Sequence, residues 1–449
     1  MKTFNKIFLI MFVGLVLSAP QAIASERQRV INVTTVEQLY SAVNNAANQG
    51  AKIALAPGIY VLSSTNAQGA RRPHDGSIHL LPGTSLVGSE QRVDSNFDGV
   101  PDPISPTSPD DFAVQGTETT IDGSALILPF KLRKDCGEGV TRMVPDPMIA
   151  ISRNNLITSL HLIGGNNIAL GEPAKPIDSV TSLSATVNNI VLEGNILGMT
   201  FANSGCSMSH AHSVLNFSNN VVRNSGTGLL VLNWVTGNEA DDTSNGPQSK
   251  VTATNNLFYN NGRGINLTSG NEGTDGGMIT IEMTGNVFRN NGTNLSAVAA
   301  VGREPTPAVG NHLYLISRFD TFGETTGPNL TLTAGILASE DAGEPLDSDI
   351  EAEFFHSNFV RDTPVNPDAP EISIVGSVGG GGDNHALVGI RFATVKTFAG
   401  APIFGKLLIQ DETALGSVPN TARIKGSREA FLQLNQGFHA PAARFFQKK

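Results

Sequence analysis

Three stretches of the chain repeat one pattern, and this repeat limits the possible fold more than any other feature of the sequence. Each stretch begins with Asn, continues with two apolar residues, turns at Asn-Gly or Ser-Gly and leaves on a short β run; the stretches are residues 220–231, 256–267 and 286–297. The spacings between their first asparagines are 36 and 30 residues, and a weaker copy begins at Asn195, 25 residues before Asn220. Periods of this length are typical of stacked coils, each too small to bury its own apolar face.

The apolar residues of each repeat predict three inward-facing rows of side chains, because residues two apart in a strand point to the same face. The rows before the asparagine, directly after it and after the turn contain Leu215/Phe217, Val251/Ala253, Ile281/Met283 and Ile190/Leu192; then Val222, Phe258, Phe288 and Leu197; then Leu229/Val231, Ile265/Leu267 and Leu295/Ala297. Three rows predict an all-β solenoid with three parallel sheets around one core. We expect Asn195, Asn220, Asn256 and Asn286 to stack at one corner, each amide hydrogen-bonded to the next coil.

The N-terminal part of the repeat region predicts a helix that covers the open end of the stack. Thr35 and Gln38 form a Ser/Thr-x-x-Gln capping box, apolar residues follow at helical spacing up to Ala47, and Gly50 ends the helix. Strands are expected at 51–56 and 59–62, on either side of a Pro-Gly turn. Such a cap is needed because an uncovered solenoid end exposes apolar surface and unpaired strand edges.

These segments resemble the pectate-lyase-like right-handed parallel β-helix proteins. The runs Leu39-Tyr-Ser-Ala-Val-Asn-Asn-Ala-Ala and Ile53-Ala-Leu-Ala-Pro-Gly-Ile-Tyr are similar to the N-terminal segment of that superfamily, and residues 83–88 and 119–124 are similar to its early coil turns. The resemblance spans most of residues 30–300. It implies a single-stranded right-handed parallel β-helix with an N-terminal capping α-helix. It implies no single activity, because the superfamily includes lyases, hydrolases, epimerases and tailspikes.

The chain is expected to divide at residues 24 and 311. Residues 25–311 carry the cap and the clear repeats, and from His312 the repeat blurs. Strand-like runs continue at 313–315, 330–333, 358–362, 372–375, 386–392 and 406–409. We interpret residues 312–449 as irregular coils that continue the helix; a separate C-terminal β domain is the alternative.

Residues 1–24 have the pattern of a secretory signal peptide. Lys2 and Lys6 precede an apolar run that ends at Leu17, and Ala22-Ile-Ala24 is a small-x-small cleavage site. The run is too short to span a bilayer, and no later segment is apolar enough to do so. An uncleaved anchor is the alternative. The pattern predicts a secreted or periplasmic protein that begins at Ser25.

The charge of the expected mature chain argues against nucleic-acid binding. Without the two signal lysines, 28 Lys and Arg residues face 40 Asp and Glu residues, a net charge of −12. No basic stripe is present. We expect a soluble, acidic, monomeric export product with a polysaccharide as its partner.

The two cysteines, Cys136 and Cys206, both lie in loop-like sequence. In an exported protein they are expected to form a disulfide, which would join neighbouring insertions. Two unrelated thiols are the alternative.

A calcium loop is predicted in the segment 94–102. Oxygen side chains stand at positions 1, 3, 5 and 9 of the loop, a glycine at position 6, and a backbone carbonyl is offered at position 7; the expected ligands are Asp94, Asn96, Asp98, Val100 and Asp102. Position 12 is Ser105 where helix-loop-helix calcium sites have Glu. We expect a structural Ca²⁺; a solvated turn is the alternative.

Candidate catalytic residues are Arg263, His210 and His212. Lyases of the resembled superfamily use an Arg or Lys base on the outward face of one sheet, but the outward positions of the third row are Leu230, Asn266 and Ser296. Arg263 interrupts a turn position that is Thr in the other repeats, and the two histidines lie two residues apart, where they could hold a metal or act as a base. A simple surface arginine and polar loop histidines are the alternatives.

These observations favour an exported carbohydrate-active protein, a polysaccharide lyase or glycoside hydrolase acting on an acidic polysaccharide. The absence of a base at the outward positions of the third row favours the alternative, a non-catalytic protein that binds glycan or serves as a rigid structural rod. The sequence leaves this choice open.

Overall fold

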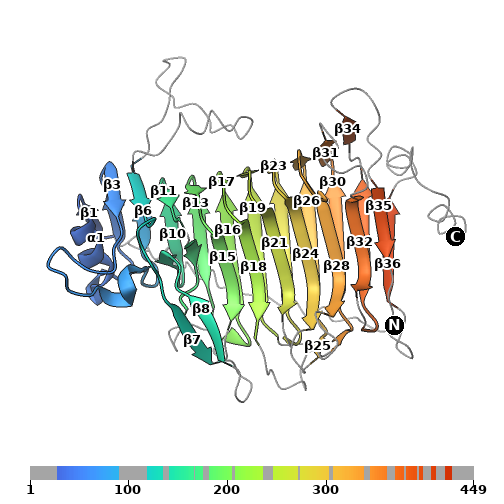
Figure 1. Ribbon diagram of the computed structural model, residues 1–449, viewed down its shortest axis with the longest axis horizontal. Coiled ribbons are helices and arrows are strands. Elements are labelled where there is room, and N and C mark those ends of the chain that lie inside the picture. Colours follow the sequence, from blue (N-terminus) through green and yellow to red (C-terminus); the bar gives the residue numbers. More distant parts are fainter. Residues whose placement is uncertain are drawn as a thin grey trace, which may run out of the picture.

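The computed structural model describes residues 28–89, 119–134, 141–165, 167–174, 182–204, 208–235, 246–271, 274–302, 307–337, 344–361, 370–378, 381–391, 394–397, 406–410 and 420–426. Most of these residues lie in short strands that wind into one elongated stack, with helix α1 (Val36–Val43) at one end (Figure 1). Strands of successive coils pair in parallel in three sheets. The expected three-sheet, right-handed parallel β-helix with an N-terminal helix is therefore confirmed.

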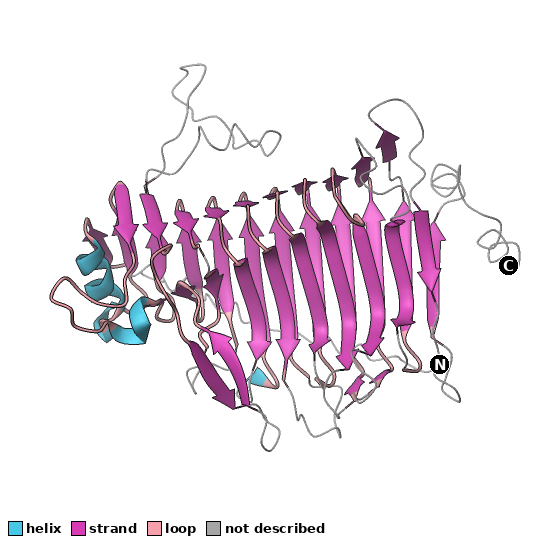
Figure 2. Cartoon of the chain, in the orientation of Figure 1, coloured by secondary structure: helices cyan, strands magenta, loops and turns pink. Residues whose placement is uncertain are grey.

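Each sheet takes one strand from successive coils, as the β arrows in Figure 2 show. The first sheet contains β1 (Val30–Val33), β2 (Lys52–Leu55), β5 (Ser85–Val87), β10 (Asn155–Thr158), β13 (Ser184–Asn188), β16 (His212–Ser218), β19 (Gln248–Thr254), β22 (Met278–Thr284), β26 (His312–Arg318), β30 (Asp349–Phe355), β33 (His385–Arg391) and β36 (Thr421–Gly426). The second contains β3 (Gly58–Val61), β6 (Thr119–Asp122), β11 (His161–Ile163), β14 (Val191–Glu193), β17 (Val221–Arg223), β20 (Leu257–Tyr259), β23 (Val287–Arg289), β27 (Thr321–Gly323), β31 (Asn358–Arg361) and β34 (Thr394–Thr397). The third contains β4 (Ile78–His79), β9 (Ile149–Ala150), β12 (Ile168–Gly171), β15 (Leu197–Ser204), β18 (Thr227–Trp234), β21 (Arg263–Asn271), β24 (Thr293–Gly302), β28 (Leu330–Leu337), β32 (Pro370–Val378) and β35 (Lys406–Gln410).

A few elements lie outside these sheets. The hairpin β7 (Phe130–Lys134) and β8 (Thr141–Pro145) is antiparallel and projects from the stack near the end that carries α1 (Figure 1). Strands β25 (Ala308–Val309) and β29 (Pro345–Leu346) form a parallel pair, and η1 (Ala46–Asn48) and η2 (Pro73–Gly76) are short 3₁₀ helices. No helix among the described residues is long and apolar enough to cross a membrane.

The N-terminal helix is capped as expected but is shorter than expected. The Thr35 hydroxyl accepts a hydrogen bond from the Gln38 backbone N–H at 3.2 Å, and the Gln38 side chain accepts one from the Thr34 N–H at 2.8 Å. Leu39, Tyr40 and Val43 are buried against the core. The helix ends at Val43, and the 3₁₀ turn η1 replaces its expected last turn.

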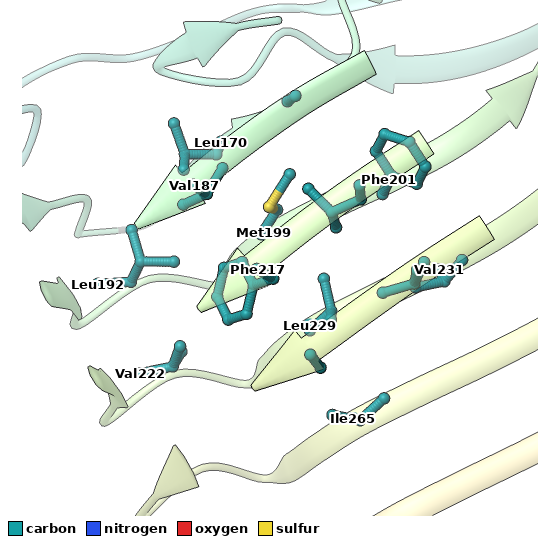
Figure 3. Close-up of a cluster of buried hydrophobic side chains, with 14 of the residues drawn as sticks. Leu170, Val187, Leu192, Met199, Phe201, Phe217, Val222, Leu229, Val231 and Ile265 are labelled. Carbon is teal, nitrogen blue, oxygen red and sulfur yellow. The ribbon is translucent and has the colours of Figure 1, made fainter. Parts of the chain in front are cut away.

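The core is a continuous apolar column inside the three sheets. Figure 3 shows Val187, Leu192 and Leu229, from the first, second and third sheets, in one buried cluster of side chains. Phenylalanine rings of successive coils stack inside the column, with centroids 4.9 Å apart for Phe258–Phe288 and for Phe288–Phe322. The inward rows predicted from residues 215–297 are buried as expected.

Strands β21 and β19 extend into the polar segments that separate the clear repeats. Strand β21 continues to Asn271, and β19 begins at Gln248. Beyond residue 311, β26 pairs in register with β22, and later strands extend all three sheets as far as β36. The expected strand-like runs of this region are confirmed as strands wherever the structure describes them, which leaves out residues 362 and 392.

Buried asparagines form the predicted ladder at the corner between the first and second sheets. The side-chain oxygen of Asn256 accepts a hydrogen bond from the Asn220 N–H at 3.0 Å, and that of Asn286 accepts one from the Asn256 N–H at 3.0 Å. The amide nitrogen of Asn256 also donates to the backbone oxygen of Phe217 at 2.9 Å. Asp320 is the next rung and accepts from the Asn286 N–H at 2.7 Å.

The expected place of Asn195 in this ladder is wrong. The ladder position in its coil is Ile190, whose N–H donates to the side-chain oxygen of Asn220. Asn195 lies at the next corner, where its N–H donates to Ser225 and the N–H of Ser225 donates to Asn261. Because this coil is offset by one corner from the expected register, Leu192 lies in the second row, opposite Val222, and Leu197 begins a third-sheet strand.

Replacing Asp320 with Asn is expected to stabilise the protein at neutral pH. Burial raises the pKa of Asp320 from 3.8 to about 6, despite hydrogen bonds from Ser317 and Asn286 that act in the opposite direction. As pH rises from about 4 to 6 the carboxyl of the unfolded chain ionises first, so ionisation favours unfolding. The shift corresponds to at most about 3 kcal/mol. Urea midpoints should therefore rise in the variant at pH 8 and be equal to those of the wild type at pH 3.5; a change independent of pH would contradict this account.

Candidate functional site

Six titratable side chains gather on the outer face of the third sheet, near the end that carries α1. Ile78 of β4 points into the core and is fully buried, so the next residue, His79, points outward. Residues from η2, from β7 and from the segment after β8 surround it. The group, called the His79 cluster below, consists of Arg71, His74, Asp75, His79, Lys131 and Asp146.

The backbone is strained where η2 enters the cluster. His74 and Asp75 have φ values of 53° and 57°, so two consecutive residues other than glycine occupy the left-handed region. Such strain tends to occur at functional sites. Here it places the His74 ring on the His79 ring, with centroids 3.6 Å apart and planes 11° apart.

His79 is held in its neutral form. Burial, and to a lesser extent the nearby His74, together lower its pKa to about 4, although the carboxylate of Asp146 acts in the opposite direction. The Nε2 atom lies 4.0 Å from Oδ1 of Asp146, beyond hydrogen-bond range, and has no partner among the described residues. The pKa of His74 is also lowered, mainly by burial.

The two carboxylates of the cluster share one ammonium group. The Lys131 Nζ forms an ion pair with Asp146 and lies 3.6 Å from Oδ2 of Asp75. Asp75 also lies 3.1 Å from the Arg71 guanidinium, and Oδ1 of Asp146 accepts a hydrogen bond from the Ala174 N–H at 2.7 Å. Both carboxylates are therefore neutralised by cations, and the formal charges of the cluster sum to zero at pH 7.

This arrangement can remove a proton from a bound molecule. A neutral imidazole is a general base at pH 7, and the facing carboxylate of Asp146 favours the tautomer with its proton on Nε2, which leaves Nδ1 as the acceptor. In enzymes, the contact between a catalytic histidine and its carboxylate often shortens to a hydrogen bond only when substrate binds. His79, Asp75 and Lys131 expose 16%, 18% and 22% of their side chains, so the cluster can be reached from solvent.

A second titratable group, on the outer face of the second sheet, is better explained as structural. Glu193 accepts hydrogen bonds from Arg223 at 2.8 Å and from Asn224 at 3.3 Å, and it contacts Nε2 of His161 at 3.0 Å. Burial lowers the pKa of His161, and Glu193 opposes this shift. With three partners on Glu193, the group links three successive coils and offers no unpaired base.

The catalytic residues predicted from the sequence lie apart from the His79 cluster, and Arg263 lies apart from the two histidines. Arg263 is exposed at the start of β21, where third-sheet strands begin. His210 and His212 are exposed after third-sheet strand β15 has ended, at the start of β16. A strand of eight residues spans roughly 25 Å. Arg263 and the histidines therefore lie at opposite edges of the third sheet, and each stays a prediction.

The predicted calcium ligands Asp94, Asn96, Asp98, Val100 and Asp102 lie outside the described residues, as do Cys136, Cys206 and the signal segment. Among the residues that are described, no group of three or more His, Cys, Asp or Glu side chains is arranged to hold a metal ion. The calcium site and the disulfide stay predictions.

Sequence reasoning missed the His79 cluster. The run Pro73-His-Asp-Gly-Ser-Ile-His79 carries its main signal, since it places two histidines and an aspartate around a short strand. Asp146 lies 67 residues further along the chain, and only the pairing of β4 with β9 brings it close.

The fold and the cluster together define a three-sheet parallel β-helix with a group of titratable side chains on its outer face. No protein-family model matches the sequence, and no curated protein is significantly similar to it. Among solved structures, the chain is similar to endopolygalacturonase I from Stereum purpureum, with 11% identity and a TM-score of 0.39, covering 88% of this chain and 99% of that one. It is also similar to the A-module of the mannuronan C-5 epimerase AlgE6 from Azotobacter vinelandii, with 14% identity and a TM-score of 0.35, covering 84% and 94%. These likenesses concern the fold.

Proposed function

We propose that the chain is an exported polysaccharide lyase that acts on an acidic polysaccharide at the His79 cluster. The observation that carries the proposal is the neutral, partly exposed imidazole of His79, which faces Asp146 and stacks on His74 in a strained turn. Export rests on the signal-like segment 1–24, and we further propose the structural Ca²⁺ site at 94–102 and the Cys136–Cys206 disulfide predicted from the sequence.

The proposed reaction is an elimination. The proton on the carbon beside the uronate carboxylate moves to Nδ1 of His79, a C=C bond forms, and the glycosidic C–O bond breaks as its oxygen takes a proton from solvent. The positive charges of Arg71 and Lys131 would offset the uronate carboxylate. Asp146 would hold the imidazolium that forms.

Elimination fits the cluster better than glycoside hydrolysis does. A glycoside hydrolase needs one of two carboxyl groups protonated as the general acid. Asp75 and Asp146 are both engaged in ion pairs with cations, so neither stands as an unpaired carboxyl group in the cluster.

The second candidate function is glycan binding without catalysis. It is favoured by the pairing of both cluster cations, because Lys131 already contacts two carboxylates and Arg71 contacts Asp75. A substrate carboxylate would have to compete with these groups.

The two functions are separated by incubating the mature protein with polygalacturonate, alginate and a neutral glucan, first with Ca²⁺ and then with a chelator. The proposal expects unsaturated products, detected by ultraviolet absorbance, from an acidic polysaccharide. New reducing ends without unsaturation would indicate a hydrolase, and binding without any product would indicate the second candidate. Loss of thermal stability in chelator would support the calcium site.

A further inference from the structure

One corner of the stack carries aromatic residues at a backbone position that other coils give to small polar residues or glycine. The corner lies between the first and second sheets, and one residue per coil there has positive φ. From the N-terminal end these residues are Ser159, Asn189, Asn219, Asn255, Gly285, Phe319 and His356, with φ values of 61°, 54°, 56°, 54°, 68°, 58° and 51°. Backbone hydrogen bonds confirm that they are equivalent, since the N–H of Gly285 donates to Arg318 and that of Phe319 donates to Phe355.

Neither backbone preference nor packing in the core explains why a phenylalanine stands at position 319. Asparagine and glycine tolerate the left-handed region, whereas a bulky residue there is an outlier that costs of order 1 kcal/mol. Burial of the ring does not offset this cost, because Phe319 is 60% exposed. Phe319 is therefore a strained, exposed aromatic residue whose position is explained neither by backbone preference nor by core packing.

The Phe319 ring has one covered face and one open face. Its covered face stacks on His356 of the next coil, with centroids 5.2 Å apart and planes 6° apart. The preceding coil has Gly285, which has no side chain to place against the other face. A Cβ at Gly285 would lie 2.6 Å from Oδ1 of Asn255, so the amide of Asn255 borders the same space.

We propose that this corner is a sugar-binding subsite in which one pyranose ring of a polysaccharide stacks on Phe319 above Gly285. The gap is one coil, about 4.8 Å along the stack, which matches the stacking distance of a sugar ring. The apolar C–H face of the sugar meets the aromatic ring, and its hydroxyl groups reach the Asn255 amide. The choice of polysaccharide as ligand rests on the proposed function.

Two neighbouring features favour an acidic sugar over a protein partner. The side chain of Arg318 is 41% exposed and lies 3.8 Å from Glu282, a loose ion pair that leaves its guanidinium able to donate hydrogen bonds to a uronate carboxylate. The corner positions beside Phe319 in the two preceding coils are Gly285 and Asn255, so the ring is not part of the larger apolar patch that a protein interface needs.

The test measures binding of polygalacturonate, alginate and a neutral glucan by calorimetry in a His79→Gln background, so that turnover does not interfere. Phe319→Asn, which installs the residue of the equivalent coils, is expected to weaken binding of an acidic polysaccharide about tenfold, with an unchanged or higher unfolding midpoint. Gly285→Asn should weaken binding similarly by filling the gap. Ile196→Asn, at an exposed apolar residue of another corner, should leave binding unchanged.

The subsite is contradicted if both corner variants bind with wild-type affinity, or if the protein with an intact corner binds none of the three polysaccharides. Binding that depends on Phe319 in a protein that releases no product would support the subsite while refuting the proposed lyase activity. The two proposals can therefore fail separately.

Discussion

Replacing His79 with Gln is expected to slow the release of unsaturated product by about 10²–10⁴-fold, the usual contribution of a positioned general base. Glutamine keeps a polar side chain on β4 but cannot take the proton. Asp146 keeps its hydrogen bond from Ala174 and its ion pair with Lys131 in the variant, so the fold should be retained. Initial rates at saturating substrate, with circular dichroism as a check on folding, measure the effect.

His385→Gln is the matched control. His385 is a half-buried histidine on β33, in the first sheet and toward the opposite end of the stack, where it contacts Asp383 and Thr421. Its loss should change the rate less than twofold. Equal rates for His79→Gln and the wild type would refute the role of His79 as base, and a collapse of activity in Arg263→Ala or His212→Ala alone would favour the residues predicted from the sequence.

Replacing Asn256 with Ala is expected to destabilise the protein by about 3–5 kcal/mol. The variant leaves the buried N–H of Asn220 without its acceptor, a loss that costs about 1–3 kcal/mol, and it also removes the side-chain hydrogen bond to the backbone oxygen of Phe217. Removal of the amide also opens a small cavity in a closely packed corner. The shift of the urea unfolding midpoint measures this cost.

Asn216→Ala is the control for Asn256→Ala, because Asn216 is exposed on the outer face of β16. It should change stability by less than about 0.5 kcal/mol, as is usual for surface substitutions. Equal midpoints for the two variants would mean that the asparagine ladder does not hold successive coils together.

The architecture could be predicted because the residues that define one coil lie within one short repeat of the sequence. Inward residues such as Leu215 and Phe217 alternate with polar residues, and the turn asparagines recur at the coil period. The capping box at Thr35 predicted the start of α1 for the same reason, since its residues lie within one helical turn.

The register of the first clear coil could not be predicted from its asparagine alone. Both corners of a coil use buried asparagines, as Asn256 and Asn261 show, so a single Asn in an incomplete repeat fits either corner. In the coil of Asn195 the ladder position at the first corner is Ile190 and not asparagine, so the ladder asparagine itself gives no signal there.

The His79 cluster could not be predicted from the sequence because its residues come from separate parts of the chain. Lys131 reaches Asp75 and Asp146 from a hairpin that interrupts the repeat, and the imidazole of His79 acquires its low pKa only through burial and the His74 ring. The burial that lowers the pKa of His79 arises from contacts between distant segments, so it cannot be read from the sequence. Arg263 and His212, in contrast, stand out in the sequence because they interrupt otherwise regular segments.

The pH dependence of unsaturated product release from an acidic polysaccharide tests the central claim most directly. A base with an ordinary histidine pKa of 6.5 loses activity as pH falls through that value, whereas His79, whose pKa is about 4, stays neutral and active well below it. The account predicts that kcat/KM has an acid limb near pH 4 that disappears in His79→Gln. An acid limb near pH 6.5, or the absence of unsaturated product from every acidic polysaccharide, would contradict it.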